Sequence, residues 1–275
     1  MDSYDKKVAR AIRLLQSIPK NGPVEVSYSG GKDSDVILEL AKMAGIDYRA
    51  IYKNTTIDPP GTIKHCREKG VEILHPEKPF YEIVKENGAP SMWYRVCCSH
   101  LKEYKVLERA IQGIRRSESV KRKKRYHEPE ECRKYKSGKA KIYYPILDWT
   151  DEDVVRFIEE RGIKCHPLYY DEKGKFRVER RLGCIGCPLS NQRERRERFK
   201  MYPKVLRRWI NSLQEYYDLH PQVKSSILYD GNACNKMFYD LFCKNMQDYI
   251  TKLEPCFDGS LDTKKFLEEY FEVEL

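Results

Sequence analysis

The 275-residue sequence predicts an α/β fold in which helices flank a parallel sheet, followed by a C-terminal helical extension. In the first part of the chain, short β-branched and aromatic runs alternate with segments of helical periodicity, which is typical of parallel strands joined by crossover helices. Beyond Pro188 the periodicity is only helical. We therefore expect one domain over residues 1–190 and a helical extension over residues 191–275.

The α/β part carries a local signal for each element. Apolar residues at helical spacing predict a helix over residues 4–17, and the alternating residues 24–28 predict a strand. A second helix passes through Met43 and ends at Gly45, a residue suited to a helix end. Further helices are expected over residues 62–69, 80–86 and 100–108, and further strands over residues 48–52, 71–74 and 109–114.

The last helix of the α/β part has its own start signal. Thr150, with Asp153 three residues later, resembles a capping box and predicts a helix that ends at Arg161. The extension then follows with four helical segments, which we expect over residues 192–201, 203–219, 236–250 and 263–271.

Hydropathy excludes a membrane protein. No stretch approaches the roughly 18–20 uninterrupted apolar residues that a membrane span needs. Residues 1–7 lack the apolar core of a signal peptide, so we expect a cytoplasmic protein with no membrane contact. In a reducing cytosol the ten cysteines favour metal binding or reactivity over disulfides.

Positive charge is concentrated in two segments. The net charge is +10, from 52 Lys and Arg against 42 Asp and Glu. Residues 115–142 hold twelve basic and four acidic residues, and residues 177–208 hold eleven and three. Such segments suit a polyanionic partner such as nucleic acid, or a phosphate-bearing substrate. A solvated basic face is the alternative.

The sharpest motif is the loop Ser29-Gly30-Gly31-Lys32-Asp33-Ser34, which follows a predicted strand and precedes a predicted helix. The two glycines let the backbone approach a ligand closely, and successive amides then form an anion-binding concavity at the helix start. Lys32 adds a cation, and Ser29 and Ser34 add hydroxyl donors. The spacing of a Walker A loop is missing. An ordinary glycine turn is the alternative.

This loop resembles the PP-loop of the ATP pyrophosphatase superfamily, which cleaves ATP between its α and β phosphates. The rest resembles one branch of it, the phosphoadenosine phosphosulfate (PAPS) reductase family. Three further parts carry the likeness, which spans about residues 24–188: residues 54–60, a proline-bearing acidic loop; residues 113–119, which match G-x-R-x-x-[EQ]-S; and residues 148–154 with 166–169.

The resemblance implies a Rossmann-like PP-loop domain that binds an adenine nucleotide, ATP with Mg²⁺. It implies catalytic roles for Lys32, Asp33 and Arg115, with Arg115 as a phosphate or sulfate clamp. It places nucleotide binding at Ser27, Ser29, Gly30, Gly31, Lys32, Asp33, Ser34, Asp58, Gly113, Arg115 and Glu118.

The second strong motif is a set of four cysteines, the pair Cys97-Cys98 and the Cys-x-x-Cys formed by Cys184 and Cys187. Soft thiolates suit iron. In iron–sulfur reductases of the resembled family, such a pair and a distant Cys-x-x-Cys together hold a [4Fe-4S] cluster, so the resemblance implies one here. A zinc site is one alternative, although adjacent cysteines make a poor first knuckle. A metal-free redox pair is another.

The remaining six cysteines are interpreted as packing residues or inert thiols: Cys66, Cys132, Cys165, Cys234, Cys243 and Cys256. Cys132 lies in the first basic segment, where it could approach the nucleotide. His166 is a candidate for contact with a substrate phosphate, with a structural role equally open.

Two chemistries compete for this chain. Reductases of the family attack the substrate sulfur with a C-terminal cysteine in the motif Glu-Cys-Gly-Leu/Ile-His. That motif is missing here, and the sequence around Cys234 is the C-terminal cysteine segment that comes nearest to it. Lys32 and Asp33, in contrast, suit a β,γ-diphosphate and its Mg²⁺. We therefore favour ATP-dependent sulfur transfer, with pyrophosphate release, to a substrate that is a nucleic acid, from a sulfur donor protein. A sulfonucleotide reductase and a non-catalytic nucleic-acid-binding module are the alternatives.

Overall fold

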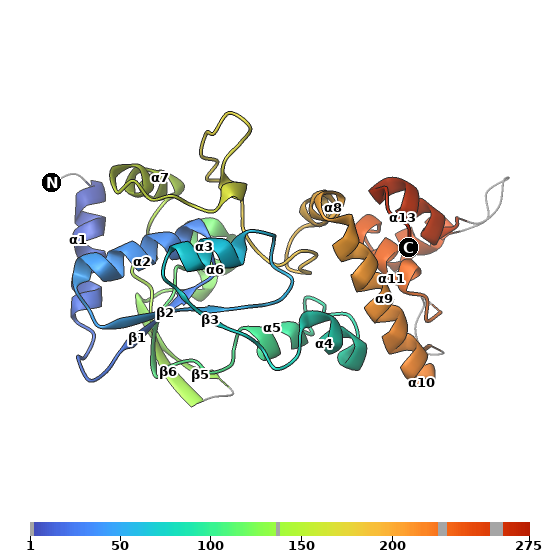
Figure 1. Cartoon of the computed structure of the whole chain (residues 1–275), viewed down its shortest axis with the longest axis horizontal. Coiled ribbons are helices and arrows are strands. Elements are labelled where there is room, and N and C mark those ends of the chain that lie inside the picture. The colour runs from blue at the N-terminus through green and yellow to red at the C-terminus, as the bar shows by residue number, and fades with distance from the viewer. Residues whose placement is uncertain (1–2, 136–137, 225–229, 254–260) are drawn as a thin grey trace. The chain divides into compact units, whose positions relative to one another are not determined.

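The computed structural model describes residues 3–135, 138–224, 230–253 and 261–275, coloured along the chain in Figure 1. They fold as two compact units. The sheet unit comprises Met1–Pro76 and Leu101–Gly183, and the helical unit comprises Glu77–His100 and Cys184–Leu275. A single boundary near residue 190 was expected from the sequence; residues 77–100 belong instead with the helical unit, and that unit resumes at Cys184.

A six-stranded sheet forms the centre of the sheet unit, with strand order β3-β2-β1-β4-β6-β5. The strands are β1 (Val24–Tyr28), β2 (Tyr48–Lys53), β3 (Glu72–Leu74), β4 (Arg109–Ile111), β5 (Glu130–Tyr135) and β6 (Gly138–Tyr143). Five are parallel, which confirms the expected α/β fold with a Rossmann-like parallel sheet. The exception is β5, which pairs antiparallel with β6 at the edge.

Strand order places a switch point beside β1. The chain moves from β1 to β2 and β3 on one side, then returns to β4 on the other side of β1. Val26 accordingly pairs with Ala50 on one flank and Ile111 on the other. In such sheets the crevice at the carboxyl ends of the strands, where the order reverses, is the usual ligand site. The loop after β1 opens at this point.

Helices pack against this sheet (Figure 1). They are α1 (Ser3–Gln16), α2 (Lys32–Ala44), α3 (Thr62–Glu68), α6 (Val120–Arg125) and α7 (Asp151–Glu160), with short 3-10 turns η1 (Arg116–Glu118) and η2 (Pro167–Tyr169). α2 packs against α1, α7 and β1. Buried Leu15, Val26 and Leu40 are among the core residues that these contacts remove from water, and burial of apolar surface is the main driving force of folding.

The helical unit is built around aromatic residues. Its helices are α4 (Phe80–Asn87), α5 (Val96–Leu101), whose last residue lies in the sheet unit, α8 (Gln192–Met201), α9 (Pro203–Leu219), α10 (Pro221–Lys224), α11 (Ala233–Phe242), α12 (Met246–Leu253) and α13 (Thr263–Phe271). α4 packs on α9 through Phe80 and Trp209, whose ring centroids are 4.6 Å apart. Phe199 of α8 contacts both Trp209 and Phe271 edge-on.

Two expected helices are wrong in extent. The helix expected over residues 100–108 is instead α5, which ends at Leu101, because Lys105 adopts a positive φ of 47°. The Leu107 N–H is also taken by the Glu25 carboxylate at 3.1 Å. The helix expected over residues 236–250 is two helices, α11 and α12. They are separated because the Asn245 side chain accepts from the Asp248 N–H at 2.9 Å and starts a new helix.

Among the described residues, no helix combines the length and the apolar composition that crossing a membrane requires.

Candidate functional site

The loop after β1 has the geometry expected of an anion-binding turn. Gly30 adopts a φ of +77°, and a Cβ there would lie 3.0 Å from both the Leu182 and the Thr62 side chains. Only glycine therefore fits without displacing its neighbours. Gly31 precedes α2, and its carbonyl accepts from two N–H groups of the first turn, those of Ser34 at 2.9 Å and Asp35 at 3.0 Å.

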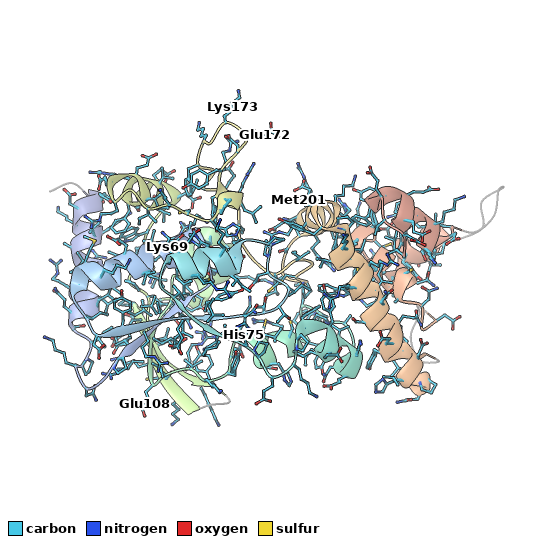
Figure 2. The ribbon with its side chains drawn as sticks, viewed as in Figure 1. Lys69, His75, Glu108, Glu172, Lys173 and Met201 are labelled. Atoms are coloured by element: carbon cyan, nitrogen blue, oxygen red, sulfur yellow. The ribbon has the colours of Figure 1, made fainter. Side chains whose placement is uncertain are left out.

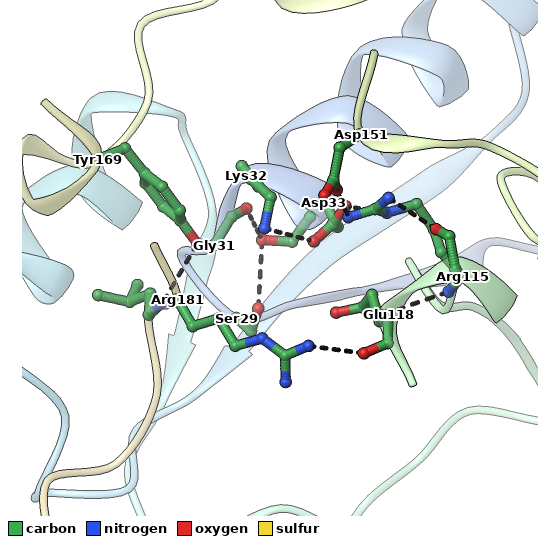
Figure 3. Close-up of polar contacts among 12 residues, drawn as sticks. Ser29, Gly31, Lys32, Asp33, Arg115, Glu118, Asp151, Tyr169 and Arg181 are labelled. Atoms are coloured by element: carbon green, nitrogen blue, oxygen red, sulfur yellow. Dashed lines mark hydrogen bonds and ion pairs between the residues drawn. The ribbon is translucent and has the colours of Figure 1, made fainter. Parts of the chain in front are cut away.

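Ser34 closes this turn. Its N–H and its hydroxyl both donate to the Gly31 carbonyl, at 2.9 Å and 2.6 Å. The Ser29 hydroxyl lies 3.3 Å from that of Ser34, so the two predicted donors meet across the loop (Figure 3). The loop is thus held in shape by its own serines.

Lys32 is buried at the start of α2, with 3% of its surface exposed. Its Nζ lies 3.4 Å from Asp33 Oδ2 and 5.4 Å from the centre of the Tyr169 ring. The Tyr169 hydroxyl in turn accepts from the Leu182 N–H at 3.2 Å. The Lys32 ammonium is therefore held at the start of α2 between one carboxylate and one aromatic face.

Arg115 is 1% exposed and bonded on three sides (Figure 3). Its Nε donates to Asp33 Oδ1 at 2.7 Å, and one terminal nitrogen donates to Asp151 Oδ1 at 2.8 Å. The other terminal nitrogen donates to the Ser117 hydroxyl at 3.0 Å. The guanidinium therefore holds Asp33 in place, a role that the sequence prediction of a phosphate clamp did not include.

Gly113 lets the segment after β4 approach α2. A Cβ at Gly113 would lie 2.9 Å from the Asp33 carbonyl oxygen. Beyond it, the Glu118 carboxylate pairs with Arg122, and a terminal nitrogen of Arg181 donates to the Glu118 carbonyl at 2.9 Å. Burial lowers the pKa of Arg122, and the positive charge of Arg181 lowers it further. Two arginines thus gather at the segment that carries Arg115.

Two further predicted nucleotide-binding residues have hydrogen-bond partners within the sheet unit. The Ser27 hydroxyl donates to Glu25 Oε1 at 2.9 Å, and the Tyr52 hydroxyl donates to Asp58 Oδ2 at 2.7 Å. Ser27 therefore faces a buried carboxylate within the sheet. Asp58 lies in the loop after β2 and is oriented by Tyr52, near the end of that strand.

Sequence reasoning missed a buried polar network beneath the loop. Asp35 accepts from the Tyr28 hydroxyl, lies 3.1 Å from His65 Nε2 and lies 3.7 Å from Nζ of Lys69, which is labelled in Figure 2. His166 stacks edge-on against His65 with ring centroids 5.8 Å apart, and burial lowers its pKa. His166 is thus buried and neutral near pH 7. The only signal for this network in the sequence was the position of Asp35, one turn into the helix that follows the glycine loop.

All four cysteines of the second motif fall in the helical unit. Cys97 and Cys98 lie in the first turn of α5, and the Cys187 N–H donates to the Cys184 carbonyl at 3.3 Å in a tight turn. A hydrogen bond with Cys98 raises the pKa of the Cys97 thiol; burial and the charges of Cys98, Cys184 and Cys187 raise it further. The charges of the other three cysteines therefore act on the Cys97 thiol.

Gly186 seats the turn between Cys184 and Cys187. It adopts a φ of +75°, and a Cβ there would lie 2.4 Å from the Phe199 ring and 2.7 Å from the Trp209 ring. The turn therefore packs directly on the aromatic core of the helical unit. Within the described ranges, no group of three or more His, Cys, Asp or Glu side chains is placed to hold a single metal ion.

The other described cysteines are mostly buried. Burial raises the pKa of Cys66 to about 12 and that of Cys234 to about 11, and it also raises the pKa of Cys165 and Cys243. These thiols remain protonated at neutral pH, as inert packing residues do. Cys132 is exposed on β5. Cys256 lies outside the described residues.

The two basic segments differ in structure. In the first, Lys121, Lys123 and Lys124 of α6 are exposed, and β5 and β6 pair as antiparallel strands that the sequence did not predict. In the second, many of the arginines on α8 are paired with carboxylates; these pairs are Arg193 with Glu197, Arg198 with Glu194, and Arg195 with Asp240. The first segment is therefore the better candidate for a polyanion-binding surface.

A match to a known protein family includes most of the sheet unit. The profile of the "Phosphoadenosine phosphosulfate reductase domain" matches residues 23–190. An uncharacterized protein of Methanocaldococcus jannaschii is 30% identical over 240 residues, which cover 80% of this chain and 47% of that protein.

Two named relatives are similar at comparable identity. A tRNA-cytidine(32) 2-sulfurtransferase of Psychrobacter is 25% identical over 240 residues, covering 81% of this chain and 60% of the relative. An adenosine 5'-phosphosulfate reductase of Burkholderia cepacia is 30% identical over 124 residues, covering 40% and 48%. The chain spans about half the length of the curated relatives it matches.

Proposed function

The chain belongs to the phosphoadenosine phosphosulfate reductase domain family, and from this premise we propose that it is an ATP-dependent sulfur-transfer enzyme acting on nucleic acid. The observation that carries the proposal is the loop after β1, where buried Lys32 begins α2 beside a turn that only glycine permits. This arrangement suits the triphosphate of a nucleotide.

The proposed reaction has two steps. A carbonyl oxygen of the substrate attacks the α-phosphorus of ATP, and the bond from that phosphorus to the bridging oxygen breaks, releasing pyrophosphate. A hydrosulfide delivered by a donor protein then attacks the activated carbon and expels AMP, and loss of the proton from its sulfur leaves a carbon–sulfur double bond. The enzyme contributes mainly by positioning the reactants and stabilising the charge that develops on the phosphates.

Lys32 and Asp33 have different proposed roles in binding the phosphates. Lys32 Nζ neutralises phosphate charge from a buried position, where a cation interacts more strongly than in water. Asp33 is a candidate ligand of Mg²⁺, because carboxylate oxygens suit that hard ion. Arg115 holds Asp33 Oδ1 and so fixes the direction of its carboxylate.

The four thiols of the helical unit fit a [4Fe-4S] cluster. The donor set consists of four soft ligands, and Cys97 is within electrostatic reach of the other three. When bound, the cluster supplies electron transfer or a sulfur-handling surface; Cys97, Cys98, Cys184 and Cys187 would hold it.

The names of relatives support two substrate classes. The sulfurtransferase relative acts on tRNA by its name, which supports a nucleic-acid acceptor, and exposed lysines on α6 agree with one. The reductase relative supports the second candidate, reduction of a sulfonucleotide. That reaction needs a nucleophilic cysteine. Cys234, the nearest sequence match, is buried with a pKa raised to about 11, which counts against it.

A pyrophosphate assay with ATP and a pool of unmodified tRNA tests the proposal. We expect RNA-dependent pyrophosphate release that falls at least about tenfold in Lys32→Ala, because a buried phosphate contact is lost. Lys42→Ala, an exposed lysine at the far end of the same helix, is the matched control and should retain the rate.

The outcomes separate the three candidates. Equal rates in Lys32→Ala and the wild type would refute the role of the loop. Sulfite release from a sulfonucleotide, lost in Cys234→Ser, would instead establish the reductase. RNA binding with no turnover of ATP or of a sulfonucleotide would favour a non-catalytic nucleic-acid-binding module.

A further inference from the structure

Two aromatic side chains of the helical unit are exposed to solvent. Trp93 is 92% exposed and Tyr94 is 50% exposed, whereas every other aromatic side chain in the described part of the chain is at least partly buried. Met92, which is 48% exposed, precedes them. We call these three residues the aromatic turn. Adjacent large apolar groups in water are unfavourable, so their exposure indicates a binding surface.

The aromatic turn has a defined shape. It lies in the segment that joins α4 to α5 (Figure 1). The Ser91 hydroxyl accepts from the Trp93 and Tyr94 N–H groups, at 3.2 Å and 2.9 Å, and the Ser91 N–H donates to the Tyr94 carbonyl at 2.9 Å. At the start of the segment, a Cβ at Gly88 would lie 2.9 Å from the Tyr216 ring of α9. The two exposed rings are therefore presented by an ordered, anchored turn.

The aromatic turn also lies close to the cysteines of the helical unit. Cys97 follows Trp93 by four residues, so their Cα atoms are at most about 14 Å apart. Arg95 lies between them in the chain and is exposed, and residues 88–100 contain no Asp or Glu. The charge around the exposed rings therefore favours an anionic ligand.

The proposed reaction indicates what such rings would bind. The carbonyl groups of a nucleic acid belong to its bases, and in a duplex these bases are paired and stacked. An enzyme that modifies a base must therefore hold it outside the stack. Aromatic side chains bind unstacked bases by stacking against them, and a neighbouring arginine attracts the phosphate backbone.

We propose that Trp93 and Tyr94 stack on unpaired bases of the acceptor nucleic acid and hold them near Cys97. This inference rests on the proposed function and specifies the acceptor as a single-stranded or looped segment. A protein partner fits the turn less well. A stable protein interface needs about 800 Å² from each partner, which is more than three side chains supply, whereas one base needs only one ring.

Tryptophan fluorescence reports directly on the aromatic turn. The chain has three tryptophans, and Trp149 and Trp209 are only 2% and 3% exposed. Stacking of a base on Trp93 should therefore quench the same part of the emission that acrylamide quenches in the free protein. The two probes are an oligouridylate, whose bases stay unpaired, and a fully paired RNA duplex of the same length.

Binding by variants gives the magnitude of the effect. We expect Trp93→Ala to bind the oligouridylate about tenfold more weakly, because one stacked base is lost, and Trp93→Phe to stay within about threefold of the wild type. No charge is removed, so the slope of log affinity against log salt should not change. The matched control is Met201→Ala, which shortens an apolar side chain that is 57% exposed on α8. Affinity for the duplex should be equal in all four proteins.

The failures are distinguishable. Unquenched Trp93 emission at saturating oligouridylate, or wild-type affinity in Trp93→Ala, would overturn the stacking role, and so would an equal loss of affinity for the duplex or in Met201→Ala. If Trp93→Ala fails to fold, quenching in the wild type decides the question. RNA-dependent pyrophosphate release that is unchanged in Trp93→Ala would overturn this inference and leave the sulfur-transfer proposal standing. Quenching by RNA without pyrophosphate release would overturn that reaction and leave the base-binding turn in place.

Discussion

Arg115 Nε lies 2.7 Å from Asp33 Oδ1, so the segment after β4 holds the second residue of α2 by a buried charged hydrogen bond. These residues are 82 positions apart in the chain. The contact brings the carboxyl ends of two adjacent parallel strands, β1 and β4, to one site. The residue proposed to bind Mg²⁺ is therefore oriented by the central part of the sheet.

Removing this anchor should weaken the fold. We expect Arg115→Ala to lower the free energy of unfolding by about 2 kcal/mol, because it leaves two carboxylates without their partner; Asp151 is half exposed, which limits the cost. Urea unfolding measures the change. Arg10→Ala, which removes an exposed arginine 3.8 Å from Asp148, is the control and should cost less than about 1 kcal/mol. Equal losses in the two variants would contradict the anchoring role.

The loop glycine should be more sensitive than a glycine of similar backbone conformation. Gly30→Ala meets Leu182 and Thr62 at 3.0 Å, whereas Gly45, with a φ of +62°, has nothing within 4 Å of an added Cβ. Both variants carry the left-handed penalty of about 1 kcal/mol. We expect only Gly30→Ala to lose ATP affinity, at least about tenfold by calorimetry. Similar ATP affinities in both would show that loop shape does not govern binding.

The cysteine turn should depend on Gly186. Its replacement by Ala places a methyl group 2.4 Å from the Phe199 ring, so the turn must shift or the aromatic core must open. We expect Gly186→Ala to retain less than about half of the iron bound by the wild type after anaerobic reconstitution. Gly174→Ala is a close control, because Gly174 has a φ of +74° and open space around it. Full iron retention in Gly186→Ala would be the contrary result.

Cysteine alkylation should depend on pH in a defined direction. With a pKa raised to about 11, Cys234 is about one part in a thousand thiolate at pH 8, and that fraction grows about tenfold per pH unit. Exposed Cys132 should therefore react with iodoacetamide at pH 8 well before Cys234, as peptide mass spectrometry would measure.

The same shift affects stability. The pKa of Cys234 is higher in the folded than in the unfolded chain. Burial of its neutral thiol therefore contributes fully to the free energy of unfolding below a pH of about 8.5, and this contribution is lost as the pH rises toward about 11. Cys234→Ser should flatten that part of the profile of unfolding free energy against pH. Alkylation of Cys234 as fast as that of Cys132 in the folded protein would contradict the buried assignment.

Nucleic-acid binding should depend on α6. Replacing exposed Lys121, Lys123 and Lys124 with Gln should reduce the slope of log affinity against log salt by up to about 2–3, since each phosphate contact contributes about 0.9. The control replaces exposed Lys20, Lys42 and Lys64, which removes the same charge elsewhere. Equal slopes for the two triple variants would assign the effect to net charge alone.

Local signals determined many of the elements correctly. Strand 24–28 and helices 192–201, 203–219 and 263–271 match the predicted bounds, because side-chain periodicity and caps act within a few residues. Asn191, for example, accepts from the Glu194 N–H at 2.8 Å at the start of α8. The glycine loop before α2 was likewise readable, since its conformational demand belongs to the glycines themselves.

Tertiary structure alone decided the partners. The pairing of Arg115 with Asp33 and the buried contacts of Asp35 with His65 both join residues at least 30 positions apart. Local periodicity carries no information on such pairs, because they form only when sheet order and helix packing bring distant segments together. The sequence by itself thus determined the chemistry available to this protein, and packing determined which groups can act on one another.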